Sequence, residues 1–137
     1  MSIFDEASKK KVLPHVVCEP SLGVERAFLV FMFDAYTTRK DEKDKEVVVL
    51  KLHPKLAPHK AAIYPLVNKL ETDARKVYDQ LKYDIPVTFD RAGSIGRRYV
   101  RADETGVPFC VTFDFDSKDD ASVTIRDRDS AEQKRVK

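Results

Sequence analysis

The stretch Ala61-Ala-Ile-Tyr-Pro-Leu66 predicts a β-strand, and the residues after it determine the fold class. An amphipathic pattern follows directly and predicts a helix over about residues 68–82. The apolar face of that helix consists of Leu70, Ala74, Val77 and Leu81. Residues 86–89 then predict a short second strand. Strand, helix and strand in this order are typical of α/β folds.

The alternation continues towards the C-terminus. A turn at Gly93 opens a second helix, which should end before Gly106. Strands are predicted at 109–115 and 122–127, and Ser130 is a candidate cap for a last helix. From residue 59 the order is β-α-β-α-β-β, which predicts an α/β fold with a sheet of mixed direction.

The N-terminal part has a different character. Residues 24–36 predict a helix with apolar residues on every face, and such a helix needs cover on all sides. A short strand is predicted at Val16–Cys18 and another at Val47–Leu52, and the eight charged residues of Arg39–Glu46 predict a solvated loop. The segment 53–58 carries two prolines and is typical of a linker. We therefore expect two units, residues 1–57 and 58–137.

Composition narrows the function little. The 25 basic residues nearly balance the 23 acidic ones, so the net charge of +2 does not indicate a nucleic-acid binder. Cys18 and Cys110 lie far apart, which argues against a disulfide framework or a zinc site. No apolar run approaches the length of a membrane helix, and the N-terminus lacks a signal core. We expect a soluble cytoplasmic protein without membrane contact.

Two basic rows are candidates for binding. Four arginines and no acid occur between residues 91 and 102, on or beside the second helix. The positive N-terminus of a helix attracts phosphate, and arginine stacks on bases or binds them through two hydrogen bonds. A solvated helix face with an Arg101–Glu104 ion pair is the alternative. In the strand predicted at 122–127, side chains alternate between two faces. Arg126, and Arg128 just after the strand, form a basic row on one face, and the other face is apolar. The alternative here is a charge-protected edge strand.

Other clusters carry little chemistry. Residues 114–120 contain four aspartates, but the segment lacks the glycine and glutamate of an EF-hand loop, and a polar hairpin turn is the expected structure. The three histidines, His15, His53 and His59, have no metal-ligand spacing. The sequence predicts no metal site and no complete catalytic set of side chains.

Several blocks resemble the glycyl-tRNA synthetase family, a family of class II aminoacyl-tRNA synthetases. Residues 17–26, Val-Cys-Glu-Pro-Ser-Leu-Gly-Val-Glu-Arg, are similar to motif 3 of that family. Residues 93–106, beginning Gly-Ser-Ile-Gly-Arg-Arg-Tyr, resemble its C-terminal signature, and residues 108–116, 123–129 and 56–58 resemble further blocks. The resemblance covers nearly all of the chain from residue 14 to residue 136.

The resemblance implies a fold and a function. It implies an anticodon-binding domain, with a mixed sheet of about five strands and helices on both faces, preceded by a helix-strand remnant of a catalytic domain. It implies that Arg26 binds ATP phosphate, that Glu19 and Ser21 bind the glycine amino group, and that the full-length enzyme is a homodimer that uses ATP with Mg²⁺. From the basic rows we infer an anticodon-binding set of Ser94, Arg97, Arg98, Arg101, Arg126 and Arg128.

Nothing in the sequence resembles motifs 1 and 2 of this family, which should precede motif 3. We therefore expect a C-terminal fragment of a glycine–tRNA ligase that binds the anticodon arm of tRNA(Gly) but does not activate glycine alone. The alternative is a stand-alone synthetase-like paralogue that acts as an RNA-binding or protein-interaction module.

Overall fold

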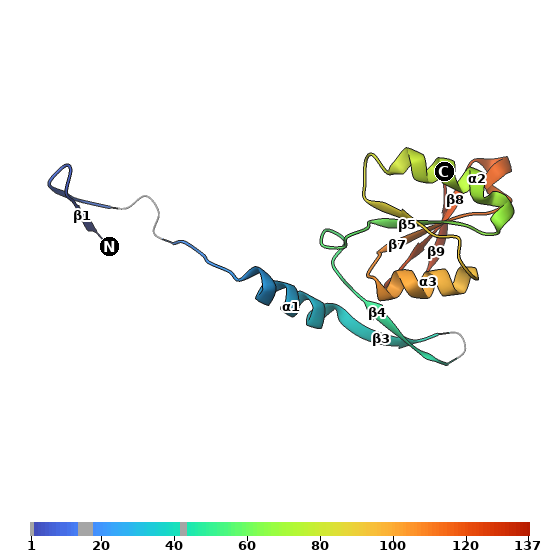
Figure 1. Ribbon diagram of the computed structural model, residues 1–137, viewed down its shortest axis with the longest axis horizontal. Coiled ribbons are helices and arrows are strands. Elements are labelled where there is room, and N and C mark those ends of the chain that lie inside the picture. Colours follow the sequence, from blue (N-terminus) through green and yellow to red (C-terminus); the bar gives the residue numbers. More distant parts are fainter. Residues whose placement is uncertain (1, 14–17, 42–43) are drawn as a thin grey trace.

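A computed structural model describes residues 2–13, 18–41 and 44–137 (Figure 1). The C-terminal part forms a five-stranded sheet in the order β6-β5-β7-β8-β9. β5 pairs parallel with β6 and β7, and β8 pairs antiparallel with β7 and β9, so the predicted mixed sheet is confirmed. The strands are β5 (Ala61–Pro65), β6 (Val87–Phe89), β7 (Phe109–Phe113), β8 (Val123–Asp127) and β9 (Gln133–Val136).

The last strand replaces the helix that Ser130 was expected to cap, so that prediction is wrong. The Asp127 carboxylate accepts hydrogen bonds from the backbone amides of Asp129 and Ser130, and each donor–acceptor distance is 2.9 Å. Ala131 then adopts a positive φ of 60°. These interactions reverse the chain into a tight turn, and β9 returns antiparallel along β8.

Two helices cover opposite faces of the sheet (Figure 1). α2 (Glu71–Leu81) follows a short 3₁₀ turn, η1 (Asn68–Leu70), and packs on the face that carries Ile63 and Val111. α3 (Ile95–Glu104) packs on the face that carries Tyr64 and Cys110, through Ile95, Tyr99 and Ala102. The alternation of β5 side chains thus supplies an apolar surface to both helices. A single-turn helix, α4 (Ser117–Asp120), lies in the segment predicted as a turn.

Residues before the linker form a helix and two hairpins. α1 (Val24–Ala35) runs directly into β3 (Tyr36–Lys40), which pairs antiparallel with β4 (Glu46–Leu50). The charged run at 39–46 is therefore part strand rather than wholly loop, because β3 extends through Lys40. A small hairpin, β1 (Ile3–Asp5) with β2 (Lys10–Val12), lies near the N-terminus. Most of the strand predicted at Val16–Cys18, and His15, lie outside the described residues.

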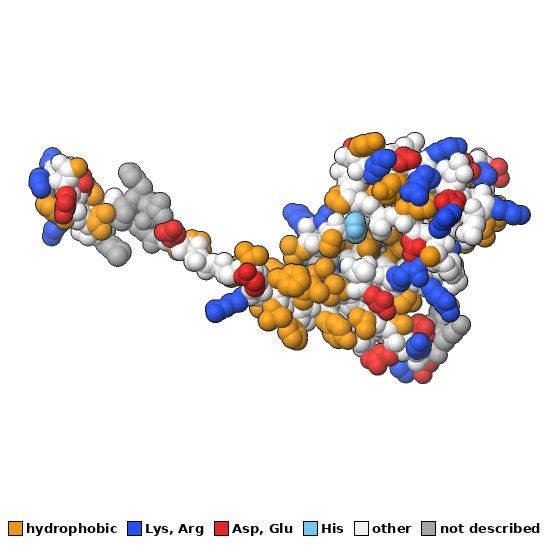
Figure 2. All heavy atoms as spheres, viewed as in Figure 1, with side chains coloured by type: hydrophobic (Ala, Val, Ile, Leu, Met, Phe, Trp, Pro, Cys, Tyr) orange, Lys and Arg blue, Asp and Glu red, His pale blue; other side chains and the backbone are white. Residues whose placement is uncertain are grey.

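α1 exposes much of its apolar surface. Phe28 is 64% exposed and Phe33 is 75% exposed, while Ala35 at the C-terminal end is buried against Leu50. Hydrophobic side chains gather along this helix in Figure 2. None of the helices in the described part of the chain has the length and apolarity needed to cross a bilayer.

Candidate nucleic-acid interface

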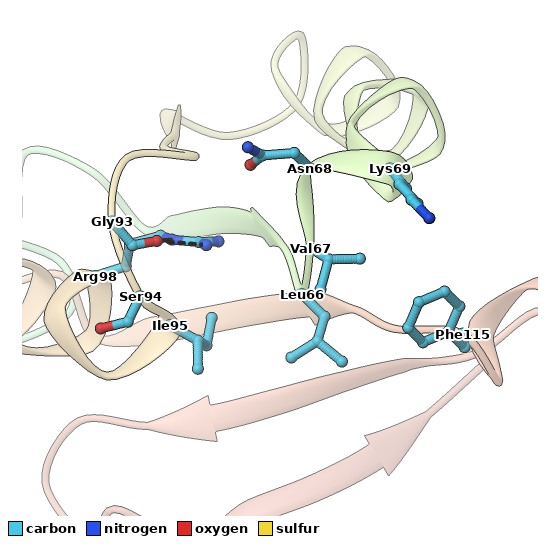
Figure 3. A pocket seen from close by; sticks show the side chains of 9 residues that line it. All are labelled: Leu66, Val67, Asn68, Lys69, Gly93, Ser94, Ile95, Arg98 and Phe115. Carbon is cyan, nitrogen blue, oxygen red and sulfur yellow. Dashed lines mark hydrogen bonds between the residues drawn. The ribbon is translucent and has the colours of Figure 1, made fainter.

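An open pocket of about 590 Å³ lies where the parallel strands end (Figure 3). The connection after β5 leads through α2 to β6 on one side, and the connection after β6 leads through α3 to β7 on the other side. Because the two connections leave towards opposite faces, they open a crevice at the carboxyl ends of the strands, which is the usual ligand position in such sheets. The lining residues are Leu66, Val67, Asn68, Lys69, Gly93, Ser94, Ile95, Arg98 and Phe115.

The pocket has an apolar interior with an aromatic ring at one side. Figure 3 places Gly93 and Ser94 on one side and Phe115 on the other, with Leu66 and Val67 between them. Phe115 is 55% exposed, so its ring is available to a ligand. Exposed aromatic rings in such positions stack on unpaired nucleobases.

The N-terminus of α3 forms the polar side of the pocket. Gly93 adopts a positive φ of 73°, which a glycine tolerates without strain, and the turn ends at Ser94, the N-cap residue. Ser94 is exposed and its side chain makes no capping hydrogen bond, so its hydroxyl group is available to a ligand. The backbone amides of the first helical turn add a partial positive charge at the same place.

Arg98 lines the pocket but serves the fold. Its guanidinium donates hydrogen bonds to the backbone oxygens of Pro65, at 2.5 Å, and of Gly93, at 2.9 Å. The residue is only 3% exposed. The side chain therefore ties the turn before α3 to the end of β5. With both carbonyls engaged in this way, Arg98 shapes the pocket wall rather than offering a free cation to RNA.

The remaining cations around the pocket divide into paired and unpaired groups. Arg101 forms an ion pair with Asp90 instead of the Glu104 pair weighed from the sequence. Burial alone would raise the pKa of Asp90, but hydrogen bonds from the Ala92 amide and from Arg101 hold that pKa below its ordinary value. Arg91 pairs with Glu71. Two pairs on the pocket side of the domain are thus already neutralised.

Lys69 and Arg97 are the cations that stay available. Both are exposed, and neither makes an ion pair within the described residues. Lys69 lies in η1 at the pocket wall, and the Arg97 Cδ lies 3.8 Å from the position that a Cβ on Gly93 would occupy. An unpaired cation in the wall of an aromatic-lined pocket and a second one beside its turn at Gly93 suit the phosphates that flank a bound base.

The prediction that Arg126 and Arg128 form an exposed basic row along β8 is wrong. Arg126 is 6% exposed and Arg128 is 1% exposed. The Arg126 guanidinium pairs with Asp103 and lies 4.9 Å from the Tyr99 ring, while Arg128 donates to the Gly106 oxygen and to Asp129. The predicted alternation along β8 is present, but α3 and its C-terminal turn cover the arginine face.

Asn68, Lys69 and Phe115 are among the pocket residues that the sequence did not predict. Asn68 and Lys69 were assigned to the predicted helix, and Phe115 to the predicted strand. Their common signal is position, because each follows the carboxyl end of a strand in the parallel part of the sheet. Side chains at such positions converge at the sheet edge where ligands bind.

The residues expected to bind glycine and ATP lie far from the pocket residues in the sequence. Glu19 and Ser21 precede α1, and Arg26 lies in its first turn; all three are exposed. A carboxylate and a hydroxyl group can accept hydrogen bonds from a glycine ammonium group, and a guanidinium can donate to an ATP phosphate. None of the three lines the pocket described above. The described residues also contain no group of three or more metal-ligating side chains.

Comparison with known proteins places this geometry in a family. The anticodon binding domain family matches residues 60–137. The chain is 50% identical to a glycine–tRNA ligase of Macrococcus caseolyticus over 98% of its length, and 52% identical to that of Alkaliphilus oremlandii over 96%. It spans 29% and 28%, respectively, of the length of those relatives.

A solved structure shares the fold. The RNA binding domain of threonyl-tRNA synthetase from Cryptosporidium parvum Iowa II superposes with a TM-score of 0.58 at 22% identity. The match covers 63% of this chain and 22% of that one. The mixed sheet with a helix on each face is thus the fold of a synthetase RNA-binding domain. The family match over residues 60–137, together with this fold, shows that the chain belongs to the anticodon binding domain family.

Proposed function

We propose that the chain binds the anticodon arm of tRNA(Gly) through the pocket at the N-terminus of α3. The observation that carries the proposal is the combination of an exposed aromatic ring, Phe115, and the unpaired cation Lys69 in the wall of one open pocket, with a second unpaired cation, Arg97, beside the lining residue Gly93. Its volume of about 590 Å³ lies within the range of roughly 300–1,000 Å³ that small-ligand sites occupy. A nucleobase turned out of the anticodon loop is a ligand of this size and chemistry.

The groups in and beside the pocket have different roles in this proposal. The Phe115 ring stacks on the base, and the apolar walls at Leu66 and Val67 exclude water from its faces. Ser94 and Asn68 present hydrogen-bonding groups that can read the edge of the base. Lys69 and Arg97 bind the flanking phosphates. Arg98, Arg126 and Arg128 hold the domain together and contact no RNA.

Direct binding tests this proposal. The chain is titrated against a labelled anticodon stem-loop of tRNA(Gly) and against a stem-loop that carries another anticodon, and fluorescence anisotropy is recorded. We expect tighter binding of the glycine stem-loop and a loss of that preference in Phe115→Ala. Equal affinity for the two stem-loops would contradict recognition of the anticodon.

We also propose that the chain acts within a glycine–tRNA ligase, which attaches glycine to tRNA and uses ATP with Mg²⁺. The curated relatives carry that name, and the chain spans less than a third of their length. In this assignment Arg26 binds an ATP phosphate, and Glu19 and Ser21 bind the ammonium group of glycine. Residues 1–57 belong to the catalytic part and residues 58–137 to the RNA-binding part. The homodimer and the cytoplasmic location stay predictions.

The isolated chain should not activate glycine. Glu19, Ser21 and Arg26 are all exposed, so they do not form an enclosed site that could align glycine with ATP. ATP–pyrophosphate exchange in the presence of glycine measures this step directly. We expect no exchange above background, and measurable exchange by the purified chain would show that this part of the assignment is wrong.

A further inference from the structure

A buried carboxylate joins the β3–β4 hairpin to the α/β part of the chain. Asp103, near the C-terminal end of α3, is 1% exposed and forms ion pairs with both Arg39 of β3 and Arg126 of β8. The same Arg39 guanidinium donates a second hydrogen bond to the backbone oxygen of Arg128, at a distance of 2.8 Å. One arginine of the β3–β4 hairpin thus contacts both α3 and the segment that follows β8.

Apolar packing surrounds this polar contact. β4 packs against α3, and Val49 and Leu50 of β4 are buried. Gly106, which follows α3, approaches Leu52 so closely that a Cβ there would lie 3.1 Å from the Leu52 Cδ1. The hairpin is therefore seated on the end of α3 by contacts of two independent kinds.

The linker between the hairpin and β5 is also tied down. The Lys60 ammonium donates to the backbone oxygens of Pro54, Lys55 and Ala57 over 2.8–2.9 Å. At the ends of the segment, the Lys51 amide donates to the backbone oxygen of Ala35, and the Lys60 amide donates to that of Pro86. Both donor–acceptor distances are 2.7 Å. Proline and these hydrogen bonds remove the freedom that a hinge requires.

We infer that the β3–β4 hairpin forms one rigid body with the sheet, and that Arg39 is the positioning residue that fixes α1 relative to α3. The chain passes from α1 to β3 without a loop, so an orientation fixed at Arg39 is transmitted directly to α1. α1 carries Arg26 in its first turn, and α3 begins at the pocket, directly after its N-cap residue Ser94. The mechanical boundary then lies before α1 rather than at the linker, where the prolines suggested it.

This arrangement gives the two candidate binding regions a fixed relative orientation. These contacts lie wholly within the chain, so the inference does not rest on the proposed function and can be tested on the chain alone. Arginine is required at position 39 because the two acceptors, a carboxylate and a carbonyl oxygen, are reached by different nitrogens of one guanidinium. A lysine keeps the charge but reaches the two acceptors less well.

Distance measurement tests the inference on the whole 137-residue chain. Spin labels are placed at Val30→Cys on α1, where the native side chain is 65% exposed, and at Lys76→Cys on α2, where it is 70% exposed. Cys18→Ser removes the exposed native thiol, and Cys110 is buried. Pulsed electron paramagnetic resonance then gives the distribution of distances between the labels.

We expect a narrow distribution in this parent chain. Arg39→Gln should broaden it about twofold, because loss of the ion pair frees the hairpin to open locally. Arg39→Lys, which keeps a positive charge beside Asp103, should give an intermediate width. Lys40→Gln is the matched control, since Lys40 is the neighbouring cation on β3 and pairs only with Asp44 at the surface among the described residues.

Three results would overturn the inference. These are a broad distribution in the parent chain, a width in Arg39→Gln equal to that of the parent, and equal broadening by Lys40→Gln. Circular dichroism reports whether each variant is folded. If Arg39→Gln does not fold, Arg39→Lys decides, with a broader distribution supporting the role of the guanidinium and an unchanged one refuting it. Neither result depends on affinity for RNA.

Discussion

Arg126 of β8 and Asp103 of α3 form a buried ion pair, in which Nη1 and Nη2 of the guanidinium lie 3.0 and 3.2 Å from the two carboxylate oxygens. Removing one partner of a buried pair leaves a charge without adequate compensation. Arg126→Met should therefore lower the free energy of unfolding by about 3 kcal/mol, near the lower end for such pairs, because Arg39 still contacts Asp103. Urea unfolding measures this change.

Arg97→Met is the control for that experiment. Arg97 is exposed and makes no ion pair within the described residues, so its replacement should change the free energy of unfolding by less than about 0.5 kcal/mol. Equal stability of the two variants would show that Arg126 does not contribute to the fold as described.

The arginines show what a sequence pattern can and cannot predict. Alternation along β8 correctly separated the face of Ile125 from the face of Arg126. Which face is covered depends on where α3 packs, and the carboxylate that receives Arg126 lies 23 positions earlier in the chain. A long cationic side chain can thus be a core residue whenever a distant acid supplies its partner, and local sequence does not contain that information.

The strand β9 illustrates a second limit. Its residues, Gln133-Lys-Arg-Val136, are all exposed and lack the apolar alternation by which strands are recognised. The strand forms because the turn at Asp127 returns the chain along β8. By contrast, β5 and α2 bury continuous apolar faces, and both were predicted within a few residues.

Gly106 and Gly96 provide a matched pair for alanine substitution. Gly106 has a φ of 77°, and a Cβ there would lie 3.1 Å from Leu52 and 3.2 Å from the Leu50 oxygen. Gly106→Ala should cost about 1–3 kcal/mol from the strained backbone, in addition to the crowding. Gly96 lies in α3 with nothing within 4 Å of such a Cβ, so Gly96→Ala should gain up to about 1 kcal/mol. Thermal unfolding compares them, and the opposite order would contradict the described packing.

Arg135 is the shared partner of two carboxylates, Asp114 and Asp120. It donates to Asp114 and Asp120, and its hydrogen bonds are the main cause that lowers the pKa of Asp114 to about 2 and the pKa of Asp120 below its ordinary value of 3.8. Groups whose pKa is lower in the folded state stabilise the fold above the unfolded value and lose that contribution as the pH falls. The chain should therefore lose stability as the pH falls from about 5 towards 2.

In Arg135→Gln this loss should be smaller, because both carboxylates return towards their ordinary pKa. Lys134→Gln is the control on the same strand, since Lys134 makes no ion pair within the described residues. Unfolding free energies measured between pH 7 and pH 2 should show a flatter curve for Arg135→Gln alone. Parallel curves for the two variants and the parent would show that these ion pairs do not govern acid unfolding.

Salt dependence separates the phosphate contacts from the base contacts at the pocket. Lys69→Ala and Arg97→Ala should each weaken binding of the anticodon stem-loop and reduce the slope of log K against log salt by about 0.7–1, because each removes one phosphate contact and its released counterion. Phe115→Ala should weaken binding without changing that slope, because stacking releases no counterion. Lys134→Ala, on β9 at the far edge of the sheet from β6, is the control and should leave both quantities unchanged. An unchanged slope in Lys69→Ala and Arg97→Ala would place the phosphate contacts elsewhere on the domain.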